Sequence, residues 1–215
     1  MANDHDPENL TLLKTTFNIT CNKDRISAHL GANAAPGPAS EALPPAVGAD
    51  SSRSCIVLAM QGDAEIIELL NEVLTSELTA INQYFVHAKM LKNQGYGRLA
   101  KKKREESIEE MHHADAVIER ILFLDGVPNM QRLFPVRVGE EPVEMHRVDL
   151  LVEKEAHARL NRGIALAVAK SDNGTRALFE SILKSEEESI DWLETHLGLI
   201  QELGRERYLA EQMGE

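Results

Sequence analysis

The sequence has few cysteines, no long apolar run and no excess of positive charge, and each absence excludes a class of protein. Its two cysteines, Cys21 and Cys55, both precede residue 60, so the rest of the chain has neither a disulfide framework nor a thiolate metal site. No apolar run approaches the ~18 residues that a membrane span needs, and "SCIVLAM" is too short and too late for a signal-peptide core. The net charge of −12 argues against nucleic acid and anionic membranes as partners. We therefore expect a cytoplasmic protein in which Glu, Asp or His would hold any metal.

Residues 1–59 and residues 60–215 differ in composition. The first part contains "GANAAPGPASEALPPAVGADSSRS", which is rich in Ala, Pro, Gly and Ser and has no helical or strand period. This composition predicts a disordered extension. An alternative interpretation is that translation starts at Met60. Under either interpretation, residues 60–215 form one domain.

Four long helices are predicted after Asp63, because apolar residues recur three or four positions apart. The first two are separated by "KNQGYG" and the last two by "SDNGT". The segment "GVPNMQRLFPVRVGEEP" has too much Pro and Gly for a helix and is long enough to cross the molecule. Pro142 suits the first turn of the third helix. The predicted fold is all-α: a four-helix bundle with a long crossover between helices 2 and 3 and a short fifth C-terminal helix.

Four glutamates interrupt the apolar stripes of the predicted helices. The residue numbers of Glu77 and Glu110 differ by 33, and so do those of Glu153 and Glu186. In an antiparallel hairpin, positions equidistant from the turn lie at the same height, so the four carboxylates should meet at one level. Ionised carboxylates in an apolar interior repel one another and lose hydration. A pair of cations removes both costs.

The spacing Glu110-x-x-His113 adds an imidazole to these carboxylates. Oxygen and imidazole ligands without sulfur suit iron or manganese, and di-metal carboxylate bundles use one Glu from each of two helices and Glu-x-x-His from each of the other two. A single Glu-x-x-His is common on solvated helix faces, so the metal prediction depends on the four matched glutamates. In the expected second motif, Glu186 is followed three residues later by Ser189 instead of His.

Four stretches resemble the bacterioferritins across nearly all of residues 60–215: "LTAINQYFVHAKM", "ESIEEMHHAD", "IERILFLDGVPN" and "IDWLETHLGLIQELG". They occur in the order and at the spacing of that family. The resemblance implies a hollow cage of 24 subunits that oxidises Fe(II) with dioxygen or hydrogen peroxide and stores the Fe(III) mineral. It also implies haem b at each two-fold interface and a ferredoxin-like reductant for iron release.

The resemblance implies a role for each residue of the predicted di-iron site. It makes Glu110 and Glu186 bridging ligands, Glu77 and His113 terminal ligands of one iron, and Glu153 the terminal carboxylate of the other. Tyr84 lies two turns from Glu77 on the same face, so it is either a hydrogen-bonding or redox-active neighbour or an ordinary core residue.

Position 189 is where this chain departs from the family pattern, which has a second histidine ligand there. A serine hydroxyl is a poor neutral ligand for Fe(II), so the second iron should bind more weakly. His157, one turn after Glu153, is a candidate substitute ligand, although a histidine paired with a carboxylate is the commoner case. Glu188 is adjacent to the gap but points away from it.

Met111 is rotated by about 100° from Glu110 and should face outward. An outward Met usually contributes packing, but the resemblance implies that it is the thioether ligand of haem iron, supplied by each of two subunits. The pocket would be lined by Leu78, Ile81, Asn82 and Phe85. Glu105 and Glu109 correspond to cavity-side groups that receive iron, or are solvated acids.

A second version of the iron-storage function and one function of a different class, a bundle that serves assembly alone, compete with a self-sufficient ferroxidase. The chain is alternatively a haem-binding cage subunit that depends on a ferroxidase-competent partner subunit, because Ser189 replaces His. A bundle for assembly alone would need no buried carboxylates. A rubrerythrin-like peroxidase is disfavoured since no Cys-x-x-Cys follows the bundle, and the small DNA-protecting ferritins lack this intrahelical ligand set and the fifth helix.

Overall fold

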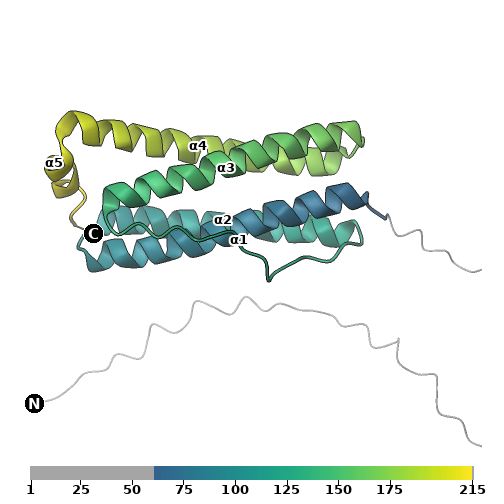
Figure 1. Cartoon of the computed structure of the whole chain (residues 1–215), viewed down its shortest axis with the longest axis horizontal. Coiled ribbons are helices and arrows are strands. Elements are labelled where there is room, and N and C mark those ends of the chain that lie inside the picture. The colour runs from purple at the N-terminus through teal and green to yellow at the C-terminus, as the bar shows by residue number, and fades with distance from the viewer. Residues whose placement is uncertain (1–60, 215) are drawn as a thin grey trace, which may run out of the picture. The chain divides into compact units, whose positions relative to one another are not determined.

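A computed structural model describes residues 61–214, which form two antiparallel helical hairpins and a short terminal helix (Figure 1). The first hairpin joins α1 and α2, and the second joins α3 and α4. The predicted fold class is therefore confirmed. The expectations for residues 1–59, with Cys21, Cys55 and the alternative start at Met60, lie outside the described residues. The helices are α1 (Ala64–Asn93), α2 (Gly97–Phe123), α3 (Pro142–Ala169), α4 (Asn173–Leu203) and α5 (Arg205–Ala210).

Capping residues explain where the helices begin. The Asp63 carboxylate accepts from the Glu65 amide (2.9 Å) at the start of α1, and Asp172 accepts from the Thr175 amide (3.0 Å) at the start of α4. Such caps satisfy amides that have no partner within the helix. Pro142 opens α3, where its missing N–H costs nothing. Gly95 takes a positive φ of 90° in the turn between α1 and α2, a conformation that favours glycine.

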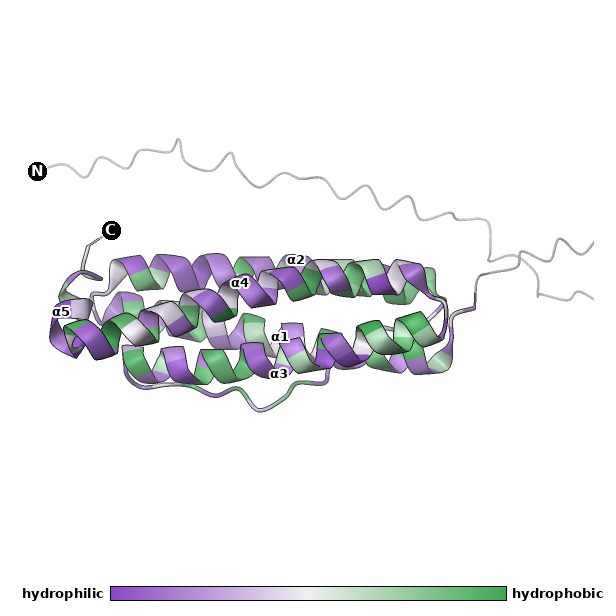
Figure 2. Ribbon diagram, turned by 90° about the horizontal axis from the view of Figure 1, so that it is seen from above, coloured by the Kyte–Doolittle hydropathy of each residue, from purple (hydrophilic) through white to green (hydrophobic). Residues whose placement is uncertain are grey.

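The apolar core is divided along the bundle. One cluster joins the start of α1, the end of α2, the end of α3 and the start of α4, and it includes Leu70, Val117 and Phe179. A second cluster packs α5 against the turn between α1 and α2 and includes Leu91 and Leu209. Polar and apolar residues alternate along every helix (Figure 2). Between the two clusters the buried residues are largely charged or polar, and this is where the predicted metal ligands lie.

The crossover from α2 to α3 is held along α1 by side chains of that helix. The amides of Phe134, Arg137 and Gly139 donate to acceptors spaced four residues apart on one face of α1, over distances of 2.9 to 3.1 Å. These bonds satisfy backbone amides of an extended segment that is not paired with a neighbouring strand. The acceptors, in order, are Thr79, Gln83 and His87.

Within residues 61–214, none of the helices combines the length and the apolar character that crossing a membrane requires.

Candidate metal centre

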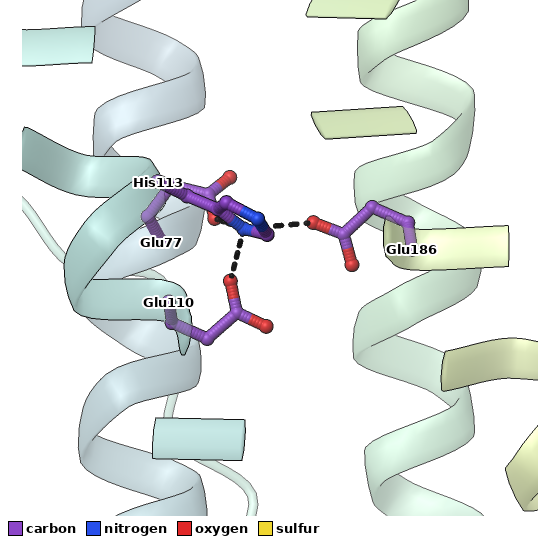
Figure 3. Close-up of side chains that lie close together, drawn as sticks. All are labelled: Glu77, Glu110, His113 and Glu186. Atoms are coloured by element: carbon purple, nitrogen blue, oxygen red, sulfur yellow. Dashed lines mark hydrogen bonds and ion pairs between the residues drawn. The ribbon is translucent and has the colours of Figure 1, made fainter. Parts of the chain in front are cut away.

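Each of the four long helices contributes one buried glutamate to a single site. Glu77 comes from α1, Glu110 from α2, Glu153 from α3 and Glu186 from α4, and all four residues are at most 2% exposed. The approach of Glu186 to the α1–α2 hairpin is visible in Figure 3. The equal spacing within the two hairpins accounts for this meeting, because it sets the four positions at one height.

His113 lies among these carboxylates. Its Nδ1 atom is 3.1 Å from Glu110 Oε2, 3.5 Å from Glu77 Oε2 and 3.8 Å from Glu186 Oε1 (Figure 3). One ligand atom from each of these four residues lies within 4.8 Å of the others. A second group with the same property consists of Glu106, Glu110 and Glu153. Glu110 belongs to both groups and so lies between them, as a ligand that bridges two metal ions must.

Burial raises the pKa values of the four carboxyl groups. Burial raises the pKa of Glu77 to about 7. It also raises the pKa values of Glu110 and Glu186 well above the ordinary value, and neighbouring carboxylates raise them further. The pKa of Glu153 is raised by burial as well. The site therefore holds protons more tightly than free carboxylates do, and a cation must displace them.

The pKa of His113 shows the same excess of negative charge. Burial alone would lower it, but the hydrogen bond to Glu110 and the charges of the surrounding glutamates raise it above the ordinary value. An imidazolium is thus the favoured occupant of the negative site when no metal is bound. A metal would replace that proton, because a ligating imidazole is neutral.

The buried oxygen of Glu77 tests whether these residues fit a metal. Its Oε1 atom is fully buried and has no hydrogen-bond partner. An unsatisfied buried carboxylate oxygen is costly, and a metal ion would supply the missing partner. Carboxylates with one imidazole and no sulfur suit iron or manganese. The residues present therefore fit a pair of such ions.

Tyr84 connects this site to the bundle interior. The buried Tyr84 hydroxyl donates to Glu153 Oε1, so the structure places Tyr84 as a hydrogen-bonding neighbour of the centre. Burial raises the pKa of Tyr84 well above its ordinary value, which keeps the hydroxyl a donor. The bond orients the Glu153 carboxylate.

The residues around position 189 are arranged differently from the sequence-based alternatives. His157 is only half-buried, and its Nε2 atom lies 3.5 Å from Glu187. Glu188 is exposed and lies 3.8 Å from Lys184. Neither belongs to the two groups of potential ligands in the described part of the chain. The Ser189 hydroxyl instead donates to Glu106 (3.1 Å), a buried glutamate of α2.

A second buried polar cluster lies beside the centre and was not predicted. Lys103 Nζ is 2.8 Å from Asp149 Oδ2, and His87 Nδ1 is 2.9 Å from Asp149 Oδ1. Gln83 donates to the same aspartate (2.9 Å). Burial alone would raise the pKa of Asp149, but Lys103 and His87 lower it to about 2. The Lys103 ammonium also lies 4.8 Å from the centre of the Tyr84 ring.

The outward face of α1 and α2 carries the residues of the expected haem pocket. Met111 is 41% exposed and Phe85 is 42% exposed, which is high for side chains of this size and apolar character. Leu78 and Ile81 are half-buried and Asn82 is exposed. Glu105 and Glu109 are also exposed. Met111 therefore lies on a different face from Glu110, as their 100° separation requires.

Comparison with known proteins agrees with this architecture. Residues 67–203 match the model of the Ferritin-like domain family. A bacterioferritin of Streptomyces coelicolor is 56% identical over 151 residues, which is 70% of this chain and 90% of the relative. Those of Mycolicibacterium paratuberculosis (53% identical, 71% and 96% covered) and Brucella melitensis (46% identical, 69% and 92% covered) are also similar. This chain therefore belongs to the bacterioferritins, within the ferritin-like family.

Proposed function

We propose that this chain stores iron and is a ferroxidase. Fe(II) is the substrate that enters the carboxylate centre, where dioxygen or hydrogen peroxide oxidises it to Fe(III). Each Fe(II) loses one electron, so a pair reduces dioxygen and two protons to hydrogen peroxide, or hydrogen peroxide and two protons to two waters. The Fe(III) product is stored as mineral inside a cage of 24 copies.

The observation that carries this proposal is the uncompensated buried charge of the centre. Four glutamates and His113 converge from four helices, and one oxygen of Glu77 lacks any partner. Such a group of ligands is unfavourable in a bundle that serves assembly alone. The family membership supports iron as the metal.

The chain's own residues bind Fe(II) and release protons. Glu110 is shared by both groups of ligands, so it is one bridge between the two positions, and the family pattern makes Glu186 the other. Glu77 and His113 complete one position, and Glu153 serves the other. Because the pKa of Glu77 is about 7, binding of Fe(II) at neutral pH displaces protons from the site. Tyr84 holds Glu153 in place through its hydroxyl.

We further propose that Met111 binds haem b between two copies of the chain. The exposed Met111 and Phe85, with Leu78 and Ile81 beside them, form an apolar outward face that a second copy and a flat apolar ring would cover. When bound, the haem would supply one-electron chemistry, and its Met ligands would raise its reduction potential, which favours acceptance of an electron from a reductant. A ferredoxin-like protein is the expected reductant.

Ser189 favours a second candidate function. Because position 189 lacks the imidazole that the family pattern provides, the chain would be a haem-binding cage subunit that depends on a partner subunit with an intact site. In that case this chain alone would take up iron but oxidise it slowly.

The test follows Fe(III) formation by absorbance after Fe(II) is added in air to the metal-free full chain. We expect a rapid phase that saturates at two Fe(II) per subunit and is lost in Glu110→Gln, since both positions share this ligand. A wild-type chain without that phase, but with the phase in Ser189→His, would support the partner-dependent function instead.

Met111→Leu separates the haem proposal from the ferroxidase proposal. This variant should lose the absorbance of bound haem and keep the rapid phase, because Met111 faces away from the centre. Retention of the haem spectrum in Met111→Leu would contradict the assignment of Met111.

A further inference from the structure

Glu106 is a buried carboxylate beside position 189. It lies one helical turn before Glu110 on α2, and its side chain is 4% exposed. One of its oxygens accepts the hydrogen bond from Ser189, and the other pairs with Lys102. Glu106, Glu110 and Glu153 each offer an oxygen within 4.8 Å of the others. The position that lacks an imidazole therefore has an additional carboxylate.

We propose, resting on the metal centre of the proposed function, that Glu106 is a ligand of the second metal ion and takes the place of a histidine at position 189. Ser189 is a positioning residue, because its hydroxyl donates to Glu106 and fixes the direction of the carboxylate. A serine side chain is also much shorter than a histidine, so it leaves room for the Glu106 carboxylate to approach.

The pairing of Glu106 with Lys102 is compatible with metal binding. The Lys102 side chain is 34% exposed, so its ammonium can turn into water when a cation approaches Glu106. Lys103, the neighbouring cation, is held by Asp149 at 2.8 Å and is 2% exposed, so it cannot take over this role. Glu106 thus has a counter-ion that can be displaced.

Charge balance gives this arrangement a chemical consequence. The four positive charges of two divalent ions balance four carboxylates, and Glu106 adds a fifth negative charge, which Lys102 offsets at the edge of the site. When the ions become trivalent, the additional carboxylate lies beside a higher positive charge. The second position consists of oxygen ligands alone, and such sites suit Mn(II) better than ions that prefer imidazole. His113 gives the first position its nitrogen ligand.

The test measures binding of Co(II) and of Mn(II) to the metal-free full chain by calorimetric titration, with Co(II) absorbance as a second readout. We expect two Co(II) per subunit in the wild type. In Glu106→Gln the second Co(II) should bind at least about tenfold more weakly while the first is unchanged, because a carboxylate ligand has become a neutral amide. Glu119→Gln, an exposed change on the same helix, is the matched control and should bind as the wild type does.

Ser189→His distinguishes a ligand from a residue that only supports the structure. This variant should strengthen binding of the second Co(II) more than that of the second Mn(II), since imidazole suits Co(II) better. In the Ser189→His background, Glu106→Gln should cost less than about threefold, because imidazole then serves the second ion. Ser189→Ala, which removes only the hydroxyl, should weaken the second ion several-fold and provides the test if Glu106→Gln does not fold.

The outcomes separate this inference from the proposed function. Equal binding of two Co(II) by the wild type and Glu106→Gln would overturn the role of Glu106. One Co(II) in both proteins, with two in Ser189→His, would overturn it as well and leave the metal centre intact. A wild type that binds no Co(II), Mn(II) or Fe(II) would overturn the proposed function itself.

Discussion

Two clusters of buried charge lie side by side in the same bundle, and they are satisfied in opposite ways. Around Asp149, Lys103 supplies positive charge, His87 and Gln83 supply hydrogen bonds, and the pKa of the aspartate falls to about 2. Around Glu110, the neighbours are other carboxylates and a single His113, and the pKa values of the carboxyl groups rise. Both clusters are buried to a similar degree, so burial alone does not explain the difference.

The difference shows what each cluster requires from outside the chain. The Asp149 cluster carries its own cation, because Lys103 Nζ lies 2.8 Å from the aspartate. The glutamate centre carries an excess of negative charge and an oxygen of Glu77 without a partner, so it is complete only when protons or metal ions are added. An uncompensated buried cluster is therefore a stronger indication of a binding site than a buried charge as such.

The largest expected effect on stability comes from removing Lys103, the cation of the Asp149 cluster. Lys103→Met should lower the free energy of unfolding of the metal-free chain by about 3–5 kcal/mol, because it leaves Asp149 buried with a reduced counter-charge. Urea denaturation followed by circular dichroism measures this change. Lys101→Met, an exposed neighbour, should stay within about 0.5 kcal/mol of the wild type. A loss below 1 kcal/mol in Lys103→Met would mean that the network is not balanced by this lysine.

The glutamate centre should give the metal-free chain an unusual pH dependence. The folded state holds the Glu77 proton more tightly than the unfolded state does, since the pKa rises from 4.5 to about 7. The stabilisation from this group is therefore complete below pH 4.5 and is lost as the pH rises through about 7. Its size is about 1–3 kcal/mol. Thermal unfolding across pH 4.5 to 8 in the presence of a chelator measures it.

Glu77→Gln and added Mn(II) provide two controls for this pH profile. The variant should lack the part of the decline that Glu77 causes, and it should be more stable than the wild type near pH 8. With Mn(II) bound, the slope should reverse, because metal binding requires deprotonated ligands. If the wild type in the presence of a chelator gains stability from pH 4.5 to 8, the carboxyl groups of the metal-free centre are not protonated as proposed. Asp149 affects stability only at acidic pH, since the stabilisation that it contributes is lost as the pH falls from 3.8 towards about 2.

The smallest expected effect concerns Tyr84, which touches both clusters. Tyr84→Phe keeps the ring beside Lys103 and removes the hydroxyl that donates to Glu153. We expect a loss of about 1 kcal/mol in the metal-free chain, and a smaller loss when a metal ion binds Glu153. Paired denaturation curves with and without Mn(II) make the comparison. An equal loss of stability with and without Mn(II) would contradict a contribution of Tyr84 to the metal centre.

Helical periodicity alone determined much of this protein. It fixed the two hairpins, the long crossover and the inward direction of the four glutamates, and the equal spacing within each hairpin fixed their common height. It also separated Met111 from Glu110, because adjacent helical residues cannot share a face.

The tertiary structure decided which inward residues meet across the bundle. Lys103 and Glu106 lie seven and four positions before Glu110, so helical periodicity puts them on the same face of α2, but it names no partner on another helix. Only the packing of α2 against α3 and α4 places Lys103 beside Asp149 and the Ser189 hydroxyl beside Glu106. The same limit applies to the crossover, which is held by side chains of α1 more than fifty residues earlier. The physical reason is that a repeat of 3.6 residues specifies the direction of a side chain, whereas its partner depends on how helices distant in sequence pack.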